Sequence, residues 1–93
     1  GTGRLVAEAA AKRHCPVTLE LGGKSPQIVF DDADLEAALP VIVNAIVQNA
    51  GQTCSAGSRL LVQRGIYETV VGRLAERFGA LRAGPPALEL EMG

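Results

Sequence analysis

The first and last parts of the chain show the apolar spacing of amphipathic helices. Residues 4–13 form an alanine-rich run that ends in Lys12 and Arg13, which complement the negative end of a helix dipole. Residues 66–82 place apolar side chains four positions apart and charged side chains on the opposite side. The pattern predicts two helices, with these inward-facing side chains in the second: Ile66, Val70, Leu74 and Phe78.

Three short runs between these helices have the pattern of strands, and the first of them is apolar and β-branched, as a short buried strand is. They cover residues 17–21, 27–30 and 58–63. Because strand and helix patterns alternate along the chain, the sequence predicts an α/β fold with parallel strands.

The stretch between the second and third runs reads as two helices. Asp34 is the expected N-cap of a short helix over 35–39. Proline disrupts a helix interior but suits a first turn, so a separate helix is expected from Pro40 to about residue 50. Apolar residues lie on most of its faces, which predicts that this helix is buried.

The composition suits the interior of a larger protein. The 93 residues are 47% hydrophobic but only 3% aromatic, and the chain does not begin with Met. An independent domain of this size buries only about 60% of its unfolded surface and is marginally stable. We therefore expect a segment of a larger α/β protein.

The charge and the cysteine count argue against several classes of protein. The net charge is −1 and no basic block is present, so nucleic-acid binding has no electrostatic basis. No apolar run approaches the roughly 20 residues that cross a bilayer. The two cysteines cannot build a disulfide framework, and no His/Cys cluster has the spacing of metal ligands. We expect a reducing, cytoplasmic setting with no metal site and no membrane or nucleic-acid partner.

Cys54 lies among small residues between Gly51 and Gly57, just past the apolar helix. Such neighbours leave a thiol open to a substrate, and backbone N–H groups nearby can stabilise an oxyanion. Cys54 is therefore a candidate nucleophile, and the alternative is a small cysteine buried in the core.

Glu20 interrupts an apolar run immediately before Gly22 and Gly23. Burying a carboxylate is costly unless it is paired, and burial increases its affinity for a proton, which suits a general base near neutral pH. The alternatives are an outward-facing residue or the partner of an arginine. A thiol and a carboxylate in glycine-flanked turns together fit covalent catalysis followed by hydrolysis of an acyl-enzyme.

Two motifs carry a family resemblance. Residues 19–26 read LELGGKSP and closely resemble the glutamate active-site motif of the aldehyde dehydrogenase superfamily. Residues 51–59 read GQTCSAGSR and resemble its cysteine active-site motif. The interval of 34 positions between Glu20 and Cys54 also matches the family. The resemblance extends over residues 3–93.

The resemblance implies an oxidoreductase that converts an aldehyde to a carboxylic acid with NAD or NADP. Cys54 would attack the aldehyde to form a thiohemiacetal, and its own N–H would be part of the oxyanion hole. Transfer of hydride to the cofactor would leave a thioester, and Glu20 would activate the water that hydrolyses it. A base at this position favours hydrolysis over acyl transfer to coenzyme A.

The resemblance also implies where the cofactor and the domains lie. Leu21 and Gly22 would lie beside the nicotinamide, where a backbone without Cβ atoms lets the ring approach. Gly3 is the end of a glycine turn that meets the cofactor pyrophosphate in this family. Residues 1–21 would end a Rossmann-like cofactor-binding domain and residues 22–93 would begin the catalytic domain. Relatives form homodimers or homotetramers.

Two other functions stay open. One is a catalytically silent segment or pseudoenzyme that keeps the motifs without a cofactor site, and the isolated 93-residue chain is expected to be inactive. The other is a thiol esterase that uses Cys54 and Glu20 without a cofactor.

The remaining polar residues suggest structural roles. His14 and Cys15 are expected at the surface or capping a helix end, and Lys24 is expected to be structural. Asn49 is expected to brace the loop around Cys54, residues 51–57, through side-chain hydrogen bonds. This stretch is called the cysteine loop below.

Overall fold

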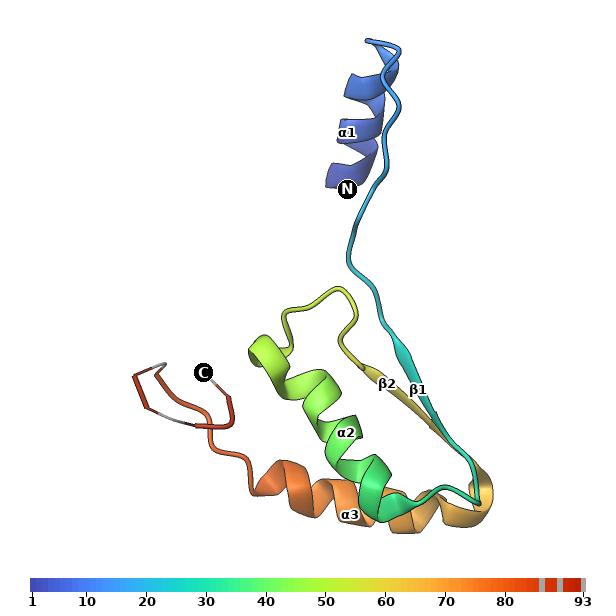
Figure 1. Ribbon diagram of the computed structural model, residues 1–93, viewed down its shortest axis with the longest axis vertical. Helices are drawn as coiled ribbons and strands as arrows, with labels where there is room; N and C mark the ends of the chain where they lie inside the picture. The colour runs from blue at the N-terminus through green and yellow to red at the C-terminus, as the bar shows by residue number, and fades with distance from the viewer. Residues whose placement is uncertain (86, 89, 93) are drawn as a thin grey trace.

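The computed structural model describes residues 1–85, 87–88 and 90–92. Figure 1 shows a helix at one end, a long extended connection, and a unit of strands and helices at the other end. The elements in chain order are α1 (Thr2–Ala11), β1 (Pro26–Val29), α2 (Leu35–Val47), the 3-10 turn η1 (Gln48–Gly51), β2 (Arg59–Val62), the 3-10 turn η2 (Arg64–Ile66) and α3 (Tyr67–Gly79).

β1 and β2 pair in parallel to form a two-stranded sheet. Pro26 is opposite Arg59 and Val29 is opposite Val62. A parallel pair needs a crossover connection, and α2 provides it. The strands predicted over 27–30 and 58–63 are confirmed to within one residue at each end, as is their parallel arrangement.

Both long helices of this unit pack on one face of the sheet (Figure 1). The buried residues of the shared core come from β1, α2 and α3, namely Val29, Leu39, Ile42, Val70 and Leu74. The opposite face carries Ile28 and Leu61, which are 61% and 48% exposed. Among the described residues, the sheet is therefore covered on one side.

The sequence predicted more buried residues in α3 and α2 than the structure shows. Val70 and Leu74 are buried as expected, but Phe78 in the last turn of α3 is 39% exposed and borders an open groove. The α2 residue Val41 is 66% exposed, so this helix is not buried on most faces. One side of α2 faces the sheet and α3, and that side alone is covered by described residues.

The predicted break at Pro40 is wrong, because α2 runs without interruption from Leu35 to Val47. Proline has no N–H to donate to the carbonyl of the residue four positions earlier, which is Glu36. Both residues are exposed, so water can satisfy that carbonyl. The start of the helix agrees with the prediction, since the Asp34 carboxylate accepts hydrogen bonds from the N–H groups of Glu36 and Ala37.

α1 packs against the extended segment that follows it, and Figure 1 shows both away from the sheet. A Cβ atom on Gly3 would lie 2.8 Å from Cδ1 of Leu21 and 3.6 Å from Cδ1 of Leu19. The helix predicted over 4–13 is confirmed for most of its length. The strand predicted over 17–21 is wrong in the described structure: an extended segment becomes a strand only when a neighbouring strand supplies ladder partners, and none lies beside it.

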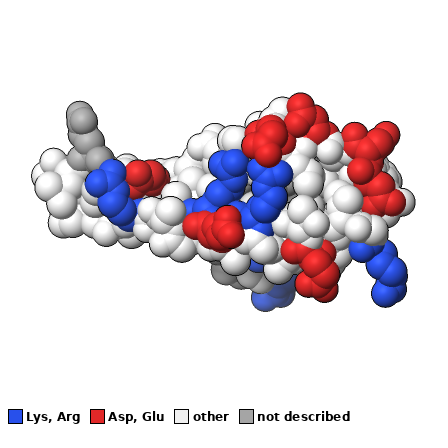
Figure 2. Space-filling model, turned by 90° about the horizontal axis from the view of Figure 1, so that it is seen from below, with Lys and Arg blue, Asp and Glu red and all other residues white. Residues whose placement is uncertain are grey.

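Charged side chains of both signs are interspersed on the face seen in Figure 2. One of the ion pairs joins Arg73 of α3 to Glu36 at the start of α2. None of the helices in the described part of the chain is long and apolar enough to cross a membrane.

Candidate active site

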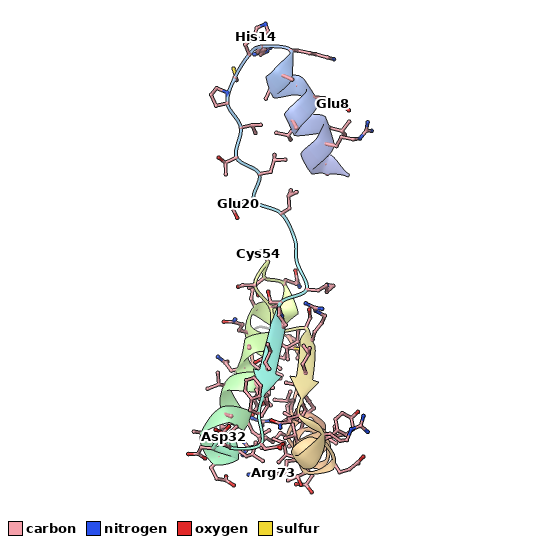
Figure 3. All side chains as sticks on the ribbon, turned by 90° about the vertical axis from the view of Figure 1, so that its right-hand side faces the viewer. Glu8, His14, Glu20, Asp32, Cys54 and Arg73 are labelled. Carbon is pink, nitrogen blue, oxygen red and sulfur yellow. The ribbon has the colours of Figure 1, made fainter. Side chains whose placement is uncertain are left out.

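An open cleft of about 820 Å³ brings the two motifs together. One wall is the segment from Glu20 to Lys24, and the other runs from Gly51 to Cys54. Figure 3 shows Glu20 on the extended segment and Cys54 at the tip of the loop that faces it. Both motifs precede the amino ends of the paired strands, so the sheet register aligns the two walls.

Arg59 ties the two walls together at the base of the cleft. Its Nε donates to the carbonyl of Lys24 at 2.8 Å, and its backbone N–H donates to the carbonyl of Ser25 at 3.3 Å. Arg59 is the last residue of the cysteine motif, whereas Lys24 and Ser25 belong to the glutamate motif. These bonds involve only the Lys24 backbone, so the expected structural role of the lysine side chain stays a prediction.

The two glycines of the glutamate motif face different surroundings. A Cβ atom on Gly22 would have no atom within 4 Å, so this part of the wall is open. A Cβ atom on Gly23 would lie 3.0 Å from the carbonyl oxygen of Cys54, which is tighter than ordinary packing allows. Gly23 thus lets the two motif backbones approach each other closely.

The backbone before the cysteine turns sharply. Asn49, Ala50 and Gly51 have φ values of 52°, 54° and 74°, three successive residues in the left-handed region. Only glycine adopts this region without cost, so Ala50 is strained. Asn49 Nδ2 donates to the carbonyl of Gln52 at 3.0 Å, which confirms the bracing hydrogen bond expected for this side chain.

Cys54 is exposed at the cleft, so the alternative of a cysteine buried in the core is wrong. The N–H of Ala56 donates to the carbonyl of Thr53 at 3.2 Å and closes a turn around the cysteine. Ala56 is buried, and the Thr53 hydroxyl is a buried polar group without a hydrogen-bond partner among the described residues.

Glu20 lines the same cleft, but its side chain is exposed. The structure therefore shows the outward-facing alternative and not a buried carboxylate, because the apolar neighbours Leu19 and Leu21 turn toward α1 and leave Glu20 uncovered. No ion pair within the described part of the chain involves Glu20. The structure thus brings the candidate base to the thiol's cleft in an open position.

Two of the three residues expected at the cofactor lie at the cleft and the third lies outside it. Leu21 and Gly22 line the cleft with Glu20 and Cys54. Gly3 does not line it and is buried beneath Leu21. The open backbone at Gly22 can admit a flat ring, so this part of the cleft fits a nicotinamide.

Polar residues outside the cleft have local roles. His14 and Cys15 are both exposed, and the Cys15 thiol donates to the carbonyl of Arg13, in agreement with the expected surface position. In the described residues no three His, Cys, Asp or Glu side chains gather as metal ligands.

Comparison with known proteins decides the family. The model of the Aldehyde dehydrogenase family matches residues 1–93. The chain belongs to this family. It is 54% identical to betaine aldehyde dehydrogenase of Cereibacter sphaeroides over 99% of its length, which is 19% of that relative.

Solved structures of aldehyde dehydrogenases have the same α/β fold over this part of the chain. A structure assigned to an aldehyde dehydrogenase from Burkholderia cenocepacia has a TM-score of 0.97 and 66% identity, covering 99% of this chain and 19% of that one. An NAD+ complex of an aldehyde dehydrogenase from Bacillus cereus has a TM-score of 0.87 and 43% identity, covering 96% and 19%. The chain thus spans about a fifth of the length of these relatives.

For this aldehyde dehydrogenase segment, sequence reasoning missed the residues that join the two motifs. Arg59 acts through an ordinary side-chain hydrogen bond to a backbone carbonyl, which no periodic pattern reveals. The close approach at Gly23 depends on the strand register, although the Gly-Gly pair did signal that something lies near the backbone.

Proposed function

We propose that the protein oxidises an aldehyde to a carboxylic acid with NAD+ or NADP+, with Cys54 as the nucleophile and Glu20 as the general base. The observation that carries this proposal is the single cleft lined by both residues. Membership of the aldehyde dehydrogenase family supports the reaction class.

The exposed thiol of Cys54 begins the reaction. As the thiolate, its sulfur forms a bond to the aldehyde carbon, and the carbonyl oxygen becomes an oxyanion that the Cys54 N–H can stabilise. The bound nicotinamide cofactor supplies the oxidation by accepting a hydride from that carbon. The acyl group then stays on the Cys54 sulfur as a thioester.

Glu20 completes the turnover. Its carboxylate takes a proton from a water molecule, and the resulting hydroxide adds to the thioester carbon and expels the Cys54 thiolate. Glu20 lines the cleft at a place where water can reach its carboxylate from the open side. A free carboxylic acid is the product.

Leu21 and Gly22 are proposed to lie beside the nicotinamide ring. The open space at Gly22 supports this, and the Bacillus cereus relative is an NAD+ complex. Gly3 is expected to contribute at the cofactor, and its packing beneath Leu21 favours an indirect contribution through that side chain. The proposed domain boundary after residue 21 is supported by the core of β1, α2, β2 and α3, which contains no buried residue from α1.

We also propose a cytoplasmic protein that forms a homodimer or homotetramer, with an aldehyde as its substrate. The two exposed cysteines, Cys15 and Cys54, suit a reducing compartment. Size measurement of the purified full-length protein and cell fractionation test these statements.

The test of the nucleophile is a pair of cysteine variants in the full-length protein. Cys54→Ser should lower the rate of aldehyde-dependent reduction of NAD+ or NADP+ about a thousandfold or more, because an alcohol is a far weaker nucleophile than a thiol at neutral pH. Cys15→Ser is the matched control and should retain the wild-type rate, since this thiol lies outside the cleft.

The same assay separates the alternatives. Activity that persists in Cys54→Ser would show that another group is the nucleophile. If the full-length protein does not bind NAD+ or NADP+ and does not reduce either cofactor, it is a pseudoenzyme. Ester hydrolysis that continues at full rate without any nicotinamide cofactor, together with no aldehyde oxidation, would favour the thiol esterase.

A further inference from the structure

Gln27 is a polar residue on the core side of β1, outside the proposed chemistry. Burial alternates along this strand, so Gln27 shares a face with buried Val29 while Ile28 points away. Its side chain borders a groove whose apolar residues are Ile42, Ile46, Leu60, Leu74 and Phe78. An amide in apolar surroundings is costly unless it is hydrogen-bonded, so its partners identify its role.

The Gln27 side chain donates to carbonyls from two different segments. Its Nε2 lies 3.1 Å from the oxygen of Gly57 and 3.4 Å from the oxygen of Ile42. Because both neighbours are acceptors, the NH₂ group must face them. Gln27 therefore connects β1, α2 and the glycine that ends the cysteine loop.

The other backbone group of Gly57 is held by α2. Its N–H donates to the carbonyl of Ala45 at 2.9 Å. Ala45 is one of the last four residues of this helix, whose carbonyls lack donors within the helix. Gly57 therefore caps the end of α2 while Gln27 holds its carbonyl, so both of its hydrogen-bonding groups are fixed.

The space around Gly57 is closed to any side chain. A Cβ atom there would meet the Gln27 amide, with 2.7 Å to Cδ, and would lie 3.1 Å from Cβ of Ala45. Cys54 lies three residues earlier, in the turn closed by the hydrogen bond from Ala56 to Thr53. The anchored end of this turn therefore fixes where the cysteine backbone lies.

We propose that Gln27 is a positioning residue, which holds Cys54 at the cleft by anchoring Gly57 against α2. It touches neither substrate nor cofactor and acts through the loop. The inference rests on the proposed role of Cys54 as nucleophile, but the anchoring itself does not depend on that role.

Two variants of nearly the same shape test the anchor in the full-length protein. Gln27→Met removes the donor, and Gln27→Glu directs a carboxylate at two carbonyl oxygens. Protection of the Ala56 and Gly57 amides, which donate to Thr53 and Ala45, against hydrogen exchange should fall about tenfold or more in both, while α3 amides keep their protection. Gln48→Met and Gln48→Glu are the matched controls, because the Gln48 side chain is exposed and this residue joins the end of α2 through its backbone N–H, which donates to Asn44.

The pH profile distinguishes an anchor from general packing. A protonated glutamic acid can donate to the Gly57 carbonyl, so Gln27→Glu should regain loop protection as the pH falls toward about 5, whereas Gln27→Met should not. Both variants should lower kcat for aldehyde oxidation about tenfold and leave the KM for the cofactor within about twofold.

The possible outcomes separate the two claims. Wild-type loop protection in both Gln27 variants would overturn the anchor, and lost protection with an unchanged kcat would overturn the positioning role. Lost protection in a protein that has no dehydrogenase activity at all would support the anchor and overturn the proposed function.

Discussion

Single atoms decide how closely the two motifs approach. Gly22 and Gly23 are adjacent in the sequence, yet one faces open space and the other faces the Cys54 carbonyl. A methyl group therefore has a different consequence at each position, which makes the pair its own control.

Gly23→Ala should lower kcat about tenfold, because a Cβ atom 3.0 Å from the Cys54 oxygen must push the cysteine backbone away. Gly22→Ala should instead raise the KM for the cofactor, since its methyl group would occupy the space proposed for the nicotinamide. Steady-state kinetics of both variants measure the split. Equal effects of the two variants on kcat and on KM would contradict this assignment.

Glu20→Gln should stall hydrolysis of the thioester while sparing the oxidation that precedes it. We expect steady-state turnover to fall about a hundredfold or more, with a rapid first burst of reduced cofactor that matches the number of active sites. Stopped-flow absorbance measures the burst. An unchanged steady-state rate would exclude Glu20 as the base.

At the scale of elements, α2 tolerates a proline that the sequence suggested would divide it. The missing hydrogen bond falls at Glu36, where water replaces it, and the buried Leu39 and Ile42 hold the helix against the sheet on either side of Pro40. Tertiary packing thus outweighs the local preference.

Pro40→Ala should raise the free energy of unfolding by about 1–2 kcal/mol, because the restored N–H can donate to the Glu36 carbonyl. The greater freedom of the unfolded chain without proline offsets part of this gain. Pro16→Ala should leave it unchanged or lower it by up to about 1 kcal/mol, since Pro16 lies outside any helix. Thermal unfolding of the full-length variants compares the two. A loss of stability in Pro40→Ala would indicate that the ring itself packs favourably.

At the scale of the whole molecule, local patterns predicted more than pairings did. The strands β1 and β2, the Asp34 cap and the core positions of α3 follow from periodicity and capping chemistry, which are encoded within a few residues. The motifs also identified Glu20 and Cys54 as partners, and the structure brings both to one cleft.

The errors share a physical cause, which is that they depend on distant neighbours. The run at 17–21 has strand composition, but pairing needs another segment beside it. The exposure of Glu20 depends on where Leu19 and Leu21 pack, and the anchor of Gly57 depends on Gln27, 30 positions away. Neither can be read from adjacent residues.

Arg82 and Glu91 form an exposed ion pair near the C-terminal end of the described residues. Arg82 donates side-chain hydrogen bonds to both carboxylate oxygens of Glu91, and this holds the pKa of Glu91 below its usual value and raises that of Arg82. Because the carboxyl of Glu91 has a lower pKa in the folded chain, the ion pair adds to stability at any pH above the usual glutamate pKa of about 4.3. This added stability is lost as the pH falls through the pKa that Glu91 has in the folded chain.

The Glu91 titration midpoint, measured by site-resolved NMR, should therefore move upward toward the usual value in Arg82→Gln. High salt should reduce the difference between the two proteins because the pair is exposed. Arg64→Gln serves as the control and should leave the Glu91 midpoint unchanged. A midpoint that does not move in Arg82→Gln would rule out the pair as the cause.

The register of β1 against β2 also sets a tolerance for changes in chain length. Pro26 lies opposite Arg59, so the glutamate wall and the cysteine wall leave the same edge of the sheet side by side. An extra residue in the turn at 31–33, at the far edge, would alter the count of 34 between Glu20 and Cys54 without moving either. The same insertion between Glu20 and Pro26, or between Cys54 and Arg59, would shift one wall past the other. The number of residues is therefore constrained between Glu20 and Pro26 and between Cys54 and Arg59, whereas the turn at 31–33 can vary in length.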